Sequence, residues 1–369
     1  MKEKTGDVVL LVGSLQMGGS ERMMIQAANH LSVSCPVTLL TLTPGETLKD
    51  EIRKQVRVVQ FNKNRTSLAL FPLIAFLRKE KPVALFSTQI HINLIAMVAK
   101  LFAQVQTKMI LIEPTPTGAH FNTFKSRSAA INRQLVRFLY PKADAIIAVS
   151  NPVKEDLLKN RFGRPEQIHV IFNPIVNDSL KEGMKKEVAD AYFETGLPVI
   201  IGLGRLAPVK NFELLIRAFA ILEKRIDCRL LIIGEGAERK KLSGLITESG
   251  LNDKAKLQGN VLNPYPWLKR AAVCVVTSFY EGGPAVLVEA MACGAQAVSV
   301  DCPGGVRDVL EDGKSGRIVP MNDPAALADA IEDAIRHPVA ASKLLESAMR
   351  YDAGKATTEY LGLVNKLSN

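Results

Sequence analysis

Two glutamates, Glu281 and Glu289, flank a glycine and proline turn, and their carboxylates could bind polar groups of a ligand. The turn, Gly282-Gly283-Pro284, follows the apolar run Val273–Thr277 and opens an apolar segment that extends to Gly294. Proline suits the first position of a helix, and the first amides of a helix lack partners and carry part of its positive dipole. The sequence therefore predicts an anion-binding turn in which the two carboxylates meet different parts of one ligand.

The alternative is that both glutamates are ordinary surface residues. Glu281 would then be a loop carboxylate near a helix start, and Glu289 would be a solvated helix residue. The predicted helix is otherwise apolar, so we do not expect Glu289 to lie on a solvent-exposed helix surface. We therefore favour a ligand-binding role for the two glutamates.

A second glycine turn follows the run Pro198–Leu203 and carries two cations, Arg205 and Lys210. Strand, glycine turn and helix in this order are typical of a phosphate-binding loop, and two cations suit a leaving diphosphate. We therefore predict a phosphate site in this turn.

The same segment also fits the dinucleotide pattern Gly202-x-Gly204-x-x-Ala207. That fit is weak, because Pro208 would interrupt the helix that should begin there. No acidic residue ends the next strand at the required distance, since Glu235 comes later.

A third glycine turn, Gly18-Gly19, joins the apolar run Val8–Val12 to a predicted helix at Met23–Leu31. It allows a ligand to approach the backbone. The alternative is a plain strand-to-helix loop whose glycines supply positive φ.

Several motifs are absent from the sequence. There is no Asp-x-Asp clamp for a metal-bound nucleotide sugar and no histidine pair at zinc-ligand spacing, so we expect no metal and no cofactor. The absence of G-x-x-x-x-G-K-[ST] and of G-x-S-x-G argues against an NTPase and an α/β-hydrolase.

The elements that position these turns alternate between short apolar runs and amphipathic segments, which predicts two doubly wound parallel-sheet domains of the α/β class. We place the first at 1–180 and the second at 181–345, with a C-terminal helix at about 346–369 packing back on the first and a linker in or near Asn177–Gly196. The strands predicted for the two domains are Val8–Val12, Val37–Thr41, Val83–Phe86, Met109–Ile112, Ala145–Val149, Ile168–Ile171, Pro198–Leu203, Arg229–Ile233, Lys256–Gln258, Val273–Thr277, Ala297–Val300 and Gly316–Val319.

The net charge of +10 lies wholly in the first half of the chain, where residues 1–180 hold 23 Lys and Arg against 13 Asp and Glu. This asymmetry indicates an anionic partner for that half. Five cysteines without a C-x2-C pair favour a reduced, cytoplasmic protein. The N-terminus lacks the features of a signal peptide, and no segment is apolar enough to span a membrane.

Taken together, these motifs resemble the retaining glycosyltransferases of family 4, which have the two-domain GT-B fold. The resemblance covers almost the whole chain. It rests on seven segments in the family's order: Gly18-Gly19-Ser20-Glu21-Arg22, Gly204-Arg205-Leu206 with Lys210, Ile233-Gly234-Glu235-Gly236, Gly259-Asn260-Val261, the Glu-x7-Glu motif from Glu281 to Glu289, Asp301-Cys302-Pro303-Gly304-Gly305, and Gly313-x-x-Gly316.

The resemblance implies two Rossmann-like domains facing across a cleft. It also implies transfer of a sugar, with retained configuration, from a nucleoside diphosphate donor such as UDP-GlcNAc, UDP-GalNAc or UDP-Glc. The acceptor would be a glycan or lipid-linked saccharide in cell-surface polysaccharide or glycan biosynthesis. The alternatives are a GT-B-like nucleotide-sugar epimerase and a non-enzymatic binder of nucleotide or nucleic acid.

Site roles follow from the same resemblance. Arg205 and Lys210 would hold the diphosphate, Glu289 the ribose, and Glu281 the donor sugar; we take Glu281, Arg205 and Lys210 as catalytic. The remaining donor-binding residues would be Gly18, Gly19, Gly204, Asn260, Val261, Leu262, Gly282, Gly283, Pro284 and Ala285.

One position departs from the family pattern. Many members carry a histidine, often in a Glu-His pair, after the strand that matches Met109–Ile112, whereas this chain reads Glu113-Pro114-Thr115. Glu113 and His120 are candidate substitutes. We expect His91, which lies in an apolar segment, to be structural, with acceptor binding as the alternative.

In this fold the second half usually grips the donor and the first half the acceptor. The basic-flanked apolar segment 65–79 would suit a lipid-diphosphate acceptor at an anionic membrane, which makes the protein peripheral on the inner face of the cell membrane. The alternative is an ordinary amphipathic helix packed on the sheet. Nucleic acid is disfavoured, because basic residues are not interleaved with aromatics.

Overall fold

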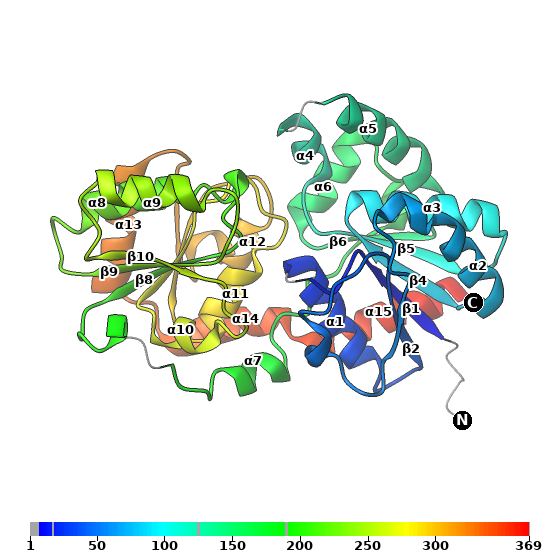
Figure 1. The fold of residues 1–369 in the computed structure, drawn as a ribbon, viewed down its shortest axis with the longest axis horizontal. Coiled ribbons are helices and arrows are strands. Elements are labelled where there is room, and N and C mark those ends of the chain that lie inside the picture. Colours follow the sequence, from blue (N-terminus) through cyan, green and yellow to red (C-terminus); the bar gives the residue numbers. More distant parts are fainter. Residues whose placement is uncertain (1–6, 17, 124–125, 189–190, 369) are drawn as a thin grey trace. The chain divides into compact units, whose positions relative to one another are not determined.

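The computed structural model describes residues 7–16, 18–123, 126–188 and 191–368 and divides the chain into two compact units (Figure 1). The first unit comprises Met1–Pro174 and Asp352–Asn369, and the second comprises Ile175–Tyr351. For comparison, the division predicted from sequence lies at residue 180 and the return near residue 346.

The first unit is built on a seven-stranded parallel sheet in the order β3-β2-β1-β4-β5-β6-β7. The inner strands are buried on both faces, which explains their continuous apolar sequences. The strands are β1 (Val8–Val12), β2 (Val37–Thr41), β3 (Arg57–Gln60), β4 (Ala84–Thr88), β5 (Lys108–Glu113), β6 (Ala145–Ala148) and β7 (Ile168–Val170).

Helices cover both faces of this sheet. Helix α1 packs against α15, while α2, α3 and α5 pack on one another in succession. The helices are α1 (Gly19–Leu31), α2 (Leu70–Glu80), α3 (Ile90–Ala103), α4 (Thr117–Thr123), α5 (Arg127–Leu139), α6 (Asn151–Asn160) and α15 (Ala353–Ser368).

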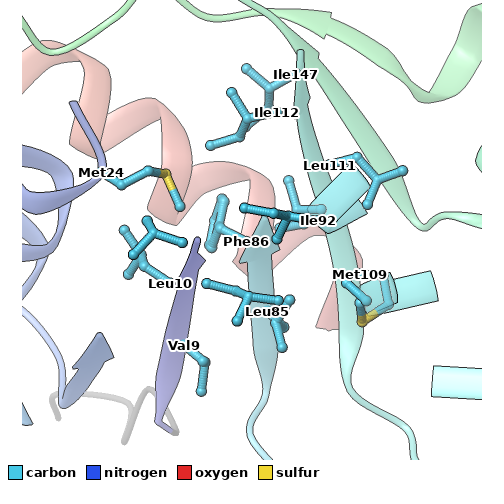
Figure 2. Packing of buried hydrophobic residues seen from close by; sticks show 14 of the residues in the cluster. Val9, Leu10, Met24, Leu85, Phe86, Ile92, Met109, Leu111, Ile112 and Ile147 are labelled. Carbon is cyan, nitrogen blue, oxygen red and sulfur yellow. The ribbon is translucent and has the colours of Figure 1, made fainter. Parts of the chain in front are cut away.

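The core of the first unit ties the end of the chain to its beginning. Figure 2 shows Leu10, Phe86 and Ile112, from three neighbouring strands, packed with Met24 of α1. The ring of Phe86 stacks on Tyr360 of α15 at 5.3 Å between centroids. The C-terminal helix therefore belongs to the core of the first unit.

The second unit has a six-stranded parallel sheet in the order β10-β9-β8-β11-β12-β13. Helix α8 packs against α9 and α13, while α11 packs against α10 and α14. Its elements are α7 (Asp178–Gly183), β8 (Val199–Leu203), α8 (Phe212–Leu222), β9 (Arg229–Ile233), α9 (Arg239–Glu248), β10 (Ala255–Gly259), α10 (Tyr265–Arg270), β11 (Val273–Val276), α11 (Ala285–Ala292), β12 (Gln296–Val300), α12 (Val306–Val309), β13 (Arg317–Val319), α13 (Pro324–Arg336) and α14 (Ala341–Ala348).

The predicted fold class is confirmed, and all twelve predicted strands are present, with ends that match the prediction or differ from it by at most two residues. One further strand, β3, is not among those predicted. It lies at the edge of its sheet, and Arg57 and Val58 are exposed, so the sequence lacks the apolar run of a buried strand.

The strand order places a switch point in each sheet. The chain reverses its direction across the sheet between β1 and β4 in the first unit and between β8 and β11 in the second. In open parallel sheets, ligands bind at the carboxyl ends of the strands at such points. Within the described part of the chain, no helix is both long and apolar enough to cross a bilayer.

Candidate active site

An ion pair joins the carboxyl ends of β8 and β11 at the switch point of the second unit. Lys210 Nζ lies 2.5 Å from Glu281 Oε1, and Ser278 Oγ donates to the same oxygen at 2.6 Å. The side chains of Lys210 and Glu281 are 27% and 13% exposed. The pair is therefore accessible enough to meet a ligand, yet sheltered enough to interact more strongly than a surface pair.

The turn that carries Lys210 is bonded to the loop that carries Glu281. Thr277 Oγ1 donates to the carbonyl of Lys210 at 2.9 Å, and the amide of Phe279 donates to the carbonyl of Val209 at 2.9 Å. As predicted, no helix begins at Pro208, where the chain makes a single 3-10 turn, and α8 begins only at Phe212. These two hydrogen bonds hold the Lys210 turn against the loop that carries Glu281.

The backbone of Glu281 is held by a neighbouring loop. Its amide donates to the carbonyl of Pro303 at 3.0 Å, and its carbonyl accepts from the amide of Gly305 at 3.1 Å. A Cβ at Gly304 would lie 1.3 Å from the Glu281 carbonyl oxygen, and Gly304 has φ +121°. Only glycine fits there, so the Asp301–Gly305 segment serves to position Glu281.

The loop that carries Arg205 lies directly on the loop after β9. The amides of Gly204 and Leu206 donate to the carbonyls of Ile233 and Glu235 at 3.0 and 2.8 Å. A Cβ at Gly234 would lie 1.9 Å from the Gly204 oxygen. The glycines therefore permit two backbones to touch, which fixes the base of the Arg205 loop.

Arg205 itself is exposed and lies within electrostatic reach of Tyr280, the residue before Glu281. Burial raises the pKa of the neighbouring Tyr280, the charge of Glu281 raises it further, and the charge of Arg205 opposes the rise. The structure thus brings Arg205, Lys210 and Glu281 to one end of the sheet.

The glycine and proline turn leads directly into α11. Pro284 caps the helix and α11 begins at Ala285, one residue later than predicted. The first turn of a helix has no internal acceptor for its amides, which here include those of Ala285 and Val286. The carbonyl of Pro284 already accepts from Leu287 at 3.0 Å. The start of α11 therefore places partial positive charge beside Glu281.

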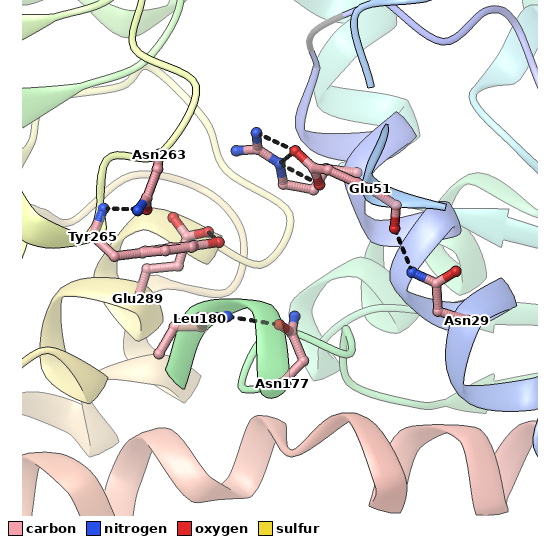
Figure 3. Close-up of polar contacts among 8 residues, drawn as sticks. Asn29, Glu51, Asn177, Leu180, Asn263, Tyr265 and Glu289 are labelled. Atoms are coloured by element: carbon pink, nitrogen blue, oxygen red, sulfur yellow. Dashed lines mark hydrogen bonds and ion pairs between the residues drawn. The ribbon is translucent and has the colours of Figure 1, made fainter. Parts of the chain in front are cut away.

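Glu289 lies on α11 and has its own partner. Tyr265 Oη donates to Glu289 Oε1 at 3.3 Å, and the amide of Tyr265 donates to Asn263 Oδ1 at 3.2 Å (Figure 3). Asn263 Nδ2 in turn donates to the carbonyl of Gly183 at 3.0 Å. This chain of contacts orients the Glu289 carboxylate, which is partly buried.

Asn260, Val261 and Leu262 form the loop that follows β10 at the edge of the sheet, two strands from β8. Asn260 and Leu262 are exposed, with Leu262 at 68%. The loop and the residues of the ion pair all follow the carboxyl ends of parallel strands, so they lie at the same end of the strands in this sheet.

The glycine turn of the first unit stands at that unit's own switch point. Neither Gly18 nor Gly19 has positive φ, so the alternative of a loop that needs positive φ is wrong. A Cβ at Gly18 would lie 2.2 Å from the carboxylate of Glu21, which accepts from Gln89 Nε2 at 2.8 Å. Gly18 therefore leaves room for a bond that links the ends of β1 and β4.

A second group of contacts fixes α1 of the first unit. Arg22 pairs with Glu51 at 2.8 Å, and Asn29 Nδ2 donates to the Glu51 carbonyl at 2.7 Å (Figure 3). Asn29 Oδ1 also accepts from the amide of Arg53 at 2.8 Å. The Arg22 of the Gly-Gly-x-Glu-Arg segment thus has a structural partner in its own unit.

Glu113 ends β5 in a wholly buried polar network. Thr117 Oγ1 donates to Glu113 Oε2 at 2.5 Å, Asn93 Nδ2 donates to Oε1 at 2.8 Å, and the hydroxyl of Tyr140 also donates to Oε1. Burial raises the pKa of Glu113 to about 7, although the three hydrogen bonds oppose the rise. All three partners are themselves buried side chains of the first unit, so the position of Glu113 lends no support to a direct donor contact.

The two candidate histidines differ in setting. His120 lies on α4, half-buried, and burial lowers its pKa. His91 lies in the first turn of α3 with part of its surface exposed, and burial of the rest lowers its pKa, so a structural role stays a prediction.

No group of three or more His, Cys, Asp or Glu side chains arranged to hold a metal occurs among the residues that the structure describes. The five cysteines are buried and unpaired. The site therefore consists of cations, carboxylates and helix amides.

Two family models match successive parts of the chain. The model described as Glycosyltransferase Family 4 matches residues 17–178, and the model described as Glycosyl transferases group 1 matches residues 184–353. The chain belongs to the family 4 glycosyltransferases.

Two relatives of this glycosyltransferase come from Campylobacter jejuni. N-acetylgalactosamine-N,N'-diacetylbacillosaminyl-diphospho-undecaprenol 4-alpha-N-acetylgalactosaminyltransferase is 28% identical over 88% of this chain and 88% of its own length. GalNAc-alpha-(1->4)-GalNAc-alpha-(1->3)-diNAcBac-PP-undecaprenol alpha-1,4-N-acetyl-D-galactosaminyltransferase is 23% identical over 98% of this chain and 99% of its own length.

The fold of the glycosyltransferase matches that of Anabaena Alr3699/HepE, solved in complex with UDP and glucose. That structure covers 98% of this chain, and this chain covers 100% of that one, with a TM-score of 0.81 at 20% identity. The likeness confirms the GT-B architecture.

Sequence reasoning missed several supporting residues of this glycosyltransferase. Ser278 and Thr277 are unremarkable polar residues until the fold places them against Glu281 and Lys210. Tyr265 and Gln89 contact Glu289 and Glu21 from distant segments. None of these contacts leaves a local pattern in the sequence.

Proposed function

We propose that this glycosyltransferase moves a sugar from a UDP-sugar to a lipid-diphosphate-linked saccharide, with retention of configuration and without a metal ion. The observation that carries the proposal is the Lys210–Glu281 pair at the switch point of the second unit. The pair brings a cation and a carboxylate together beside the start of α11, at the carboxyl ends of β8 and β11.

The diphosphate of the donor would bind to the positively charged groups of this site. Lys210, Arg205 and the first amides of α11 would contact its oxygens, and Glu289 would bind the ribose. As the bond between sugar and phosphate breaks, negative charge builds on the leaving diphosphate. Fixed cations and helix amides stabilise that charge without reorganisation, which is the role a metal fills elsewhere.

Glu281 would bind hydroxyl groups of the donor sugar. Its carboxylate is oriented by Ser278 and Lys210, and its backbone is fixed by the Asp301–Gly305 segment. A side chain that is already fixed positions a substrate better than a mobile one, because no further conformational entropy of that side chain is lost when the substrate binds.

The names of the two Campylobacter relatives support a lipid-linked acceptor, since both describe transfer to saccharides on diphospho-undecaprenol or PP-undecaprenol. The surplus positive charge in the first half of this chain suits an anionic acceptor. We therefore place the acceptor on the first unit and the protein at the inner face of the membrane, in the synthesis of a cell-surface glycan.

A thermal-shift panel of nucleotide sugars tests the donor. A true donor raises the melting temperature by mass action, and UDP-GalNAc, UDP-GlcNAc and UDP-Glc are the first choices. No shift with any UDP-sugar would contradict the proposal. Interconversion of two UDP-sugars without acceptor would instead identify an epimerase.

EDTA tests the absence of a metal, and the product tests retention. Turnover should be unchanged by EDTA, whereas its loss with recovery on added Mg²⁺ or Mn²⁺ would reject a metal-free site. The anomeric proton coupling in the NMR spectrum of the product should match that of the α-linked donor; an inverted coupling would reject retention.

A further inference from the structure

Helix α5 of the first unit presents an apolar stripe to its outer side. Ile131, Leu135 and Phe138 follow one another at helical spacing and are 61%, 40% and 63% exposed. The inner side of the same helix is already used, because Val136 and Leu139 are buried. The stripe is therefore additional to the core contacts of α5.

Neighbouring helices add to this exposed apolar surface. Helix α3 packs against both α2 and α5 (Figure 1). The last turn of α3 exposes Leu101 and Phe102. Of the thirteen large apolar residues exposed in the described part of the chain, five lie on α5 and in the last turn of α3. Such a concentration marks an interaction surface.

Only the first residues of the segment 65–79 expose apolar side chains. Leu73, Phe76 and Leu77 of α2 are buried in the unit, as expected of an ordinary amphipathic helix packed on the sheet. Leu68 and Phe71, at 58% and 79% exposure, remain outside. The apolar contact surface therefore centres on α5 and α3, away from the segment that the sequence singled out.

The charge of this region is strongly positive. Residues 65–142 hold eleven Lys and Arg against two Glu, and α5 contains no acidic residue. One of the two, Glu113, is buried, and the other, Glu80, pairs with Arg57. The ammonium of Lys142 lies 3.8 Å from the ring centre of Phe138, so cationic and apolar groups alternate at close range.

We infer that the outer surface of α5 and the end of α3 binds an anionic lipid bilayer, with the α5 stripe (Ile131, Leu135 and Phe138) entering the interface. Helices with apolar and cationic residues side by side lie in the plane of such interfaces. Arg127, Arg137 and Lys142 would contact the lipid headgroups. The inference rests on the proposed function only for the membrane-bound acceptor.

Other occupants fit this surface less well. A second copy of the chain docked symmetrically would bring like charges together. Nucleic acid would neutralise the cations but offers no apolar phase to aliphatic side chains such as Ile131 and Leu135. An anionic bilayer supplies both.

Vesicle co-sedimentation of the full chain tests the inference. Three proteins are compared with the wild type on phosphatidylcholine vesicles with and without phosphatidylglycerol. The stripe variant is Ile131→Ser/Leu135→Ser/Phe138→Ser, and the charge variant is Arg127→Gln/Arg137→Gln/Lys142→Gln. The control, Val33→Ser/Leu345→Ser, removes apolar side chains that are 75% and 47% exposed elsewhere.

The stripe variant should lose about tenfold or more in affinity for phosphatidylglycerol vesicles. The charge variant should lose about fivefold per cation, and the loss should shrink as salt is added. The control should bind like the wild type. Equal binding by the stripe variant and the wild type, with unchanged circular dichroism, would overturn the inference.

Activity separates this inference from the proposed function. On a short-chain, water-soluble acceptor, the stripe variant should transfer sugar at the wild-type rate. If the wild type transfers sugar yet ignores vesicles, the surface assignment fails and the function stands. If it binds vesicles through the stripe yet transfers nothing, the function fails and the surface stands. A stripe-dependent dimer without vesicle binding would also overturn the inference.

Discussion

Lys210 and Glu281 are separated by 71 residues in the sequence, and their side chains meet at 2.5 Å. Each comes from a loop that follows a central strand, and the two loops are bonded to each other through Thr277 and Phe279. An ammonium has three donors, so a bond to Glu281 leaves Lys210 able to bond a phosphate as well. Under the proposed function, the pair would therefore link sugar binding to diphosphate binding.

Removing either member of this pair should abolish most turnover. We expect Lys210→Ala and Glu281→Ala each to lower kcat by about 100-fold or more, the scale for losing one stabiliser of transition-state charge. Steady-state kinetics with a saturating donor checks this. Wild-type turnover in either variant would reject the assignment.

A surface ion pair of the same unit supplies the matched control. Lys241 and Glu213 lie 2.8 Å apart, with side chains 59% and 31% exposed. Lys241→Ala should leave turnover unchanged and alter the free energy of unfolding by less than about 1 kcal/mol. A large loss of activity in this variant would show that the kinetic effect is not specific to the site.

Gly304→Ala should damage the site through the backbone. The new Cβ would overlap the Glu281 carbonyl, and alanine is strained at φ +121°. We expect a loss of about 2 kcal/mol or more in unfolding free energy, together with weaker donor binding. Gly244→Ala, on α9 with nothing within 4 Å of the new Cβ, should stabilise slightly. Denaturant unfolding compares them, and equal stability of the two variants would contradict the steric account.

Glu289 should act on donor affinity more than on the chemical step. Glu289→Ala should raise the KM for the donor about tenfold or more, with a smaller change in kcat, since a ribose contact is made equally in the ground and transition states. Tyr265→Phe, which removes only the hydrogen bond to Glu289, should have a weaker effect of the same kind. A pure kcat effect would place Glu289 in the chemistry instead.

Glu113 should make stability depend on pH. In the unfolded chain its carboxyl ionises near pH 4.5, whereas in the fold its pKa is about 7. Between these values the unfolded state gives up its proton first, so the free energy of unfolding falls as pH rises, by roughly 3 kcal/mol in all. Glu113→Gln, which imitates the protonated acid, should remove this slope and be the more stable protein above pH 7.

Urea unfolding between pH 4 and 8 measures the slope. Glu359→Gln, an exposed change on α15, is the control and should keep the wild-type profile. A slope that persists in Glu113→Gln would show that another group titrates. A destabilised Glu113→Gln above pH 7 would show that the fold requires the carboxylate.

The fold follows closely from the sequence because buried parallel strands are apolar throughout. The strands β1, β8 and β11 each stand out as uninterrupted runs. Strand β3 does not, since its first residues, Arg57 and Val58, face solvent. Its place in the sheet depends on pairing with β2, which the residues of β3 alone do not indicate.

The site follows from the sequence only in part. Glycine turns, cations and carboxylates are visible as types and spacing, and so is their order along the chain. Contacts between distant segments are not: Gly304 must be glycine because Glu281 lies against it, and Glu113 is buried because Asn93 and Tyr140 surround it. Each of these contacts depends on how helices, strands and loops pack against one another, and the spacing of residues along the sequence does not show this.

We propose that the Lys210–Glu281 pair serves sugar transfer from a UDP-sugar to a lipid-linked acceptor. The most direct test incubates the wild type and Lys210→Ala with UDP-GalNAc, UDP-GlcNAc or UDP-Glc and an undecaprenyl-diphosphate saccharide, then measures product mass and UDP. We predict that one donor adds a single sugar to the acceptor, with one UDP released per sugar, and that Lys210→Ala nearly abolishes both. A correctly folded wild type that extends no such acceptor with any UDP-sugar, or a fully active Lys210→Ala, would contradict the claim.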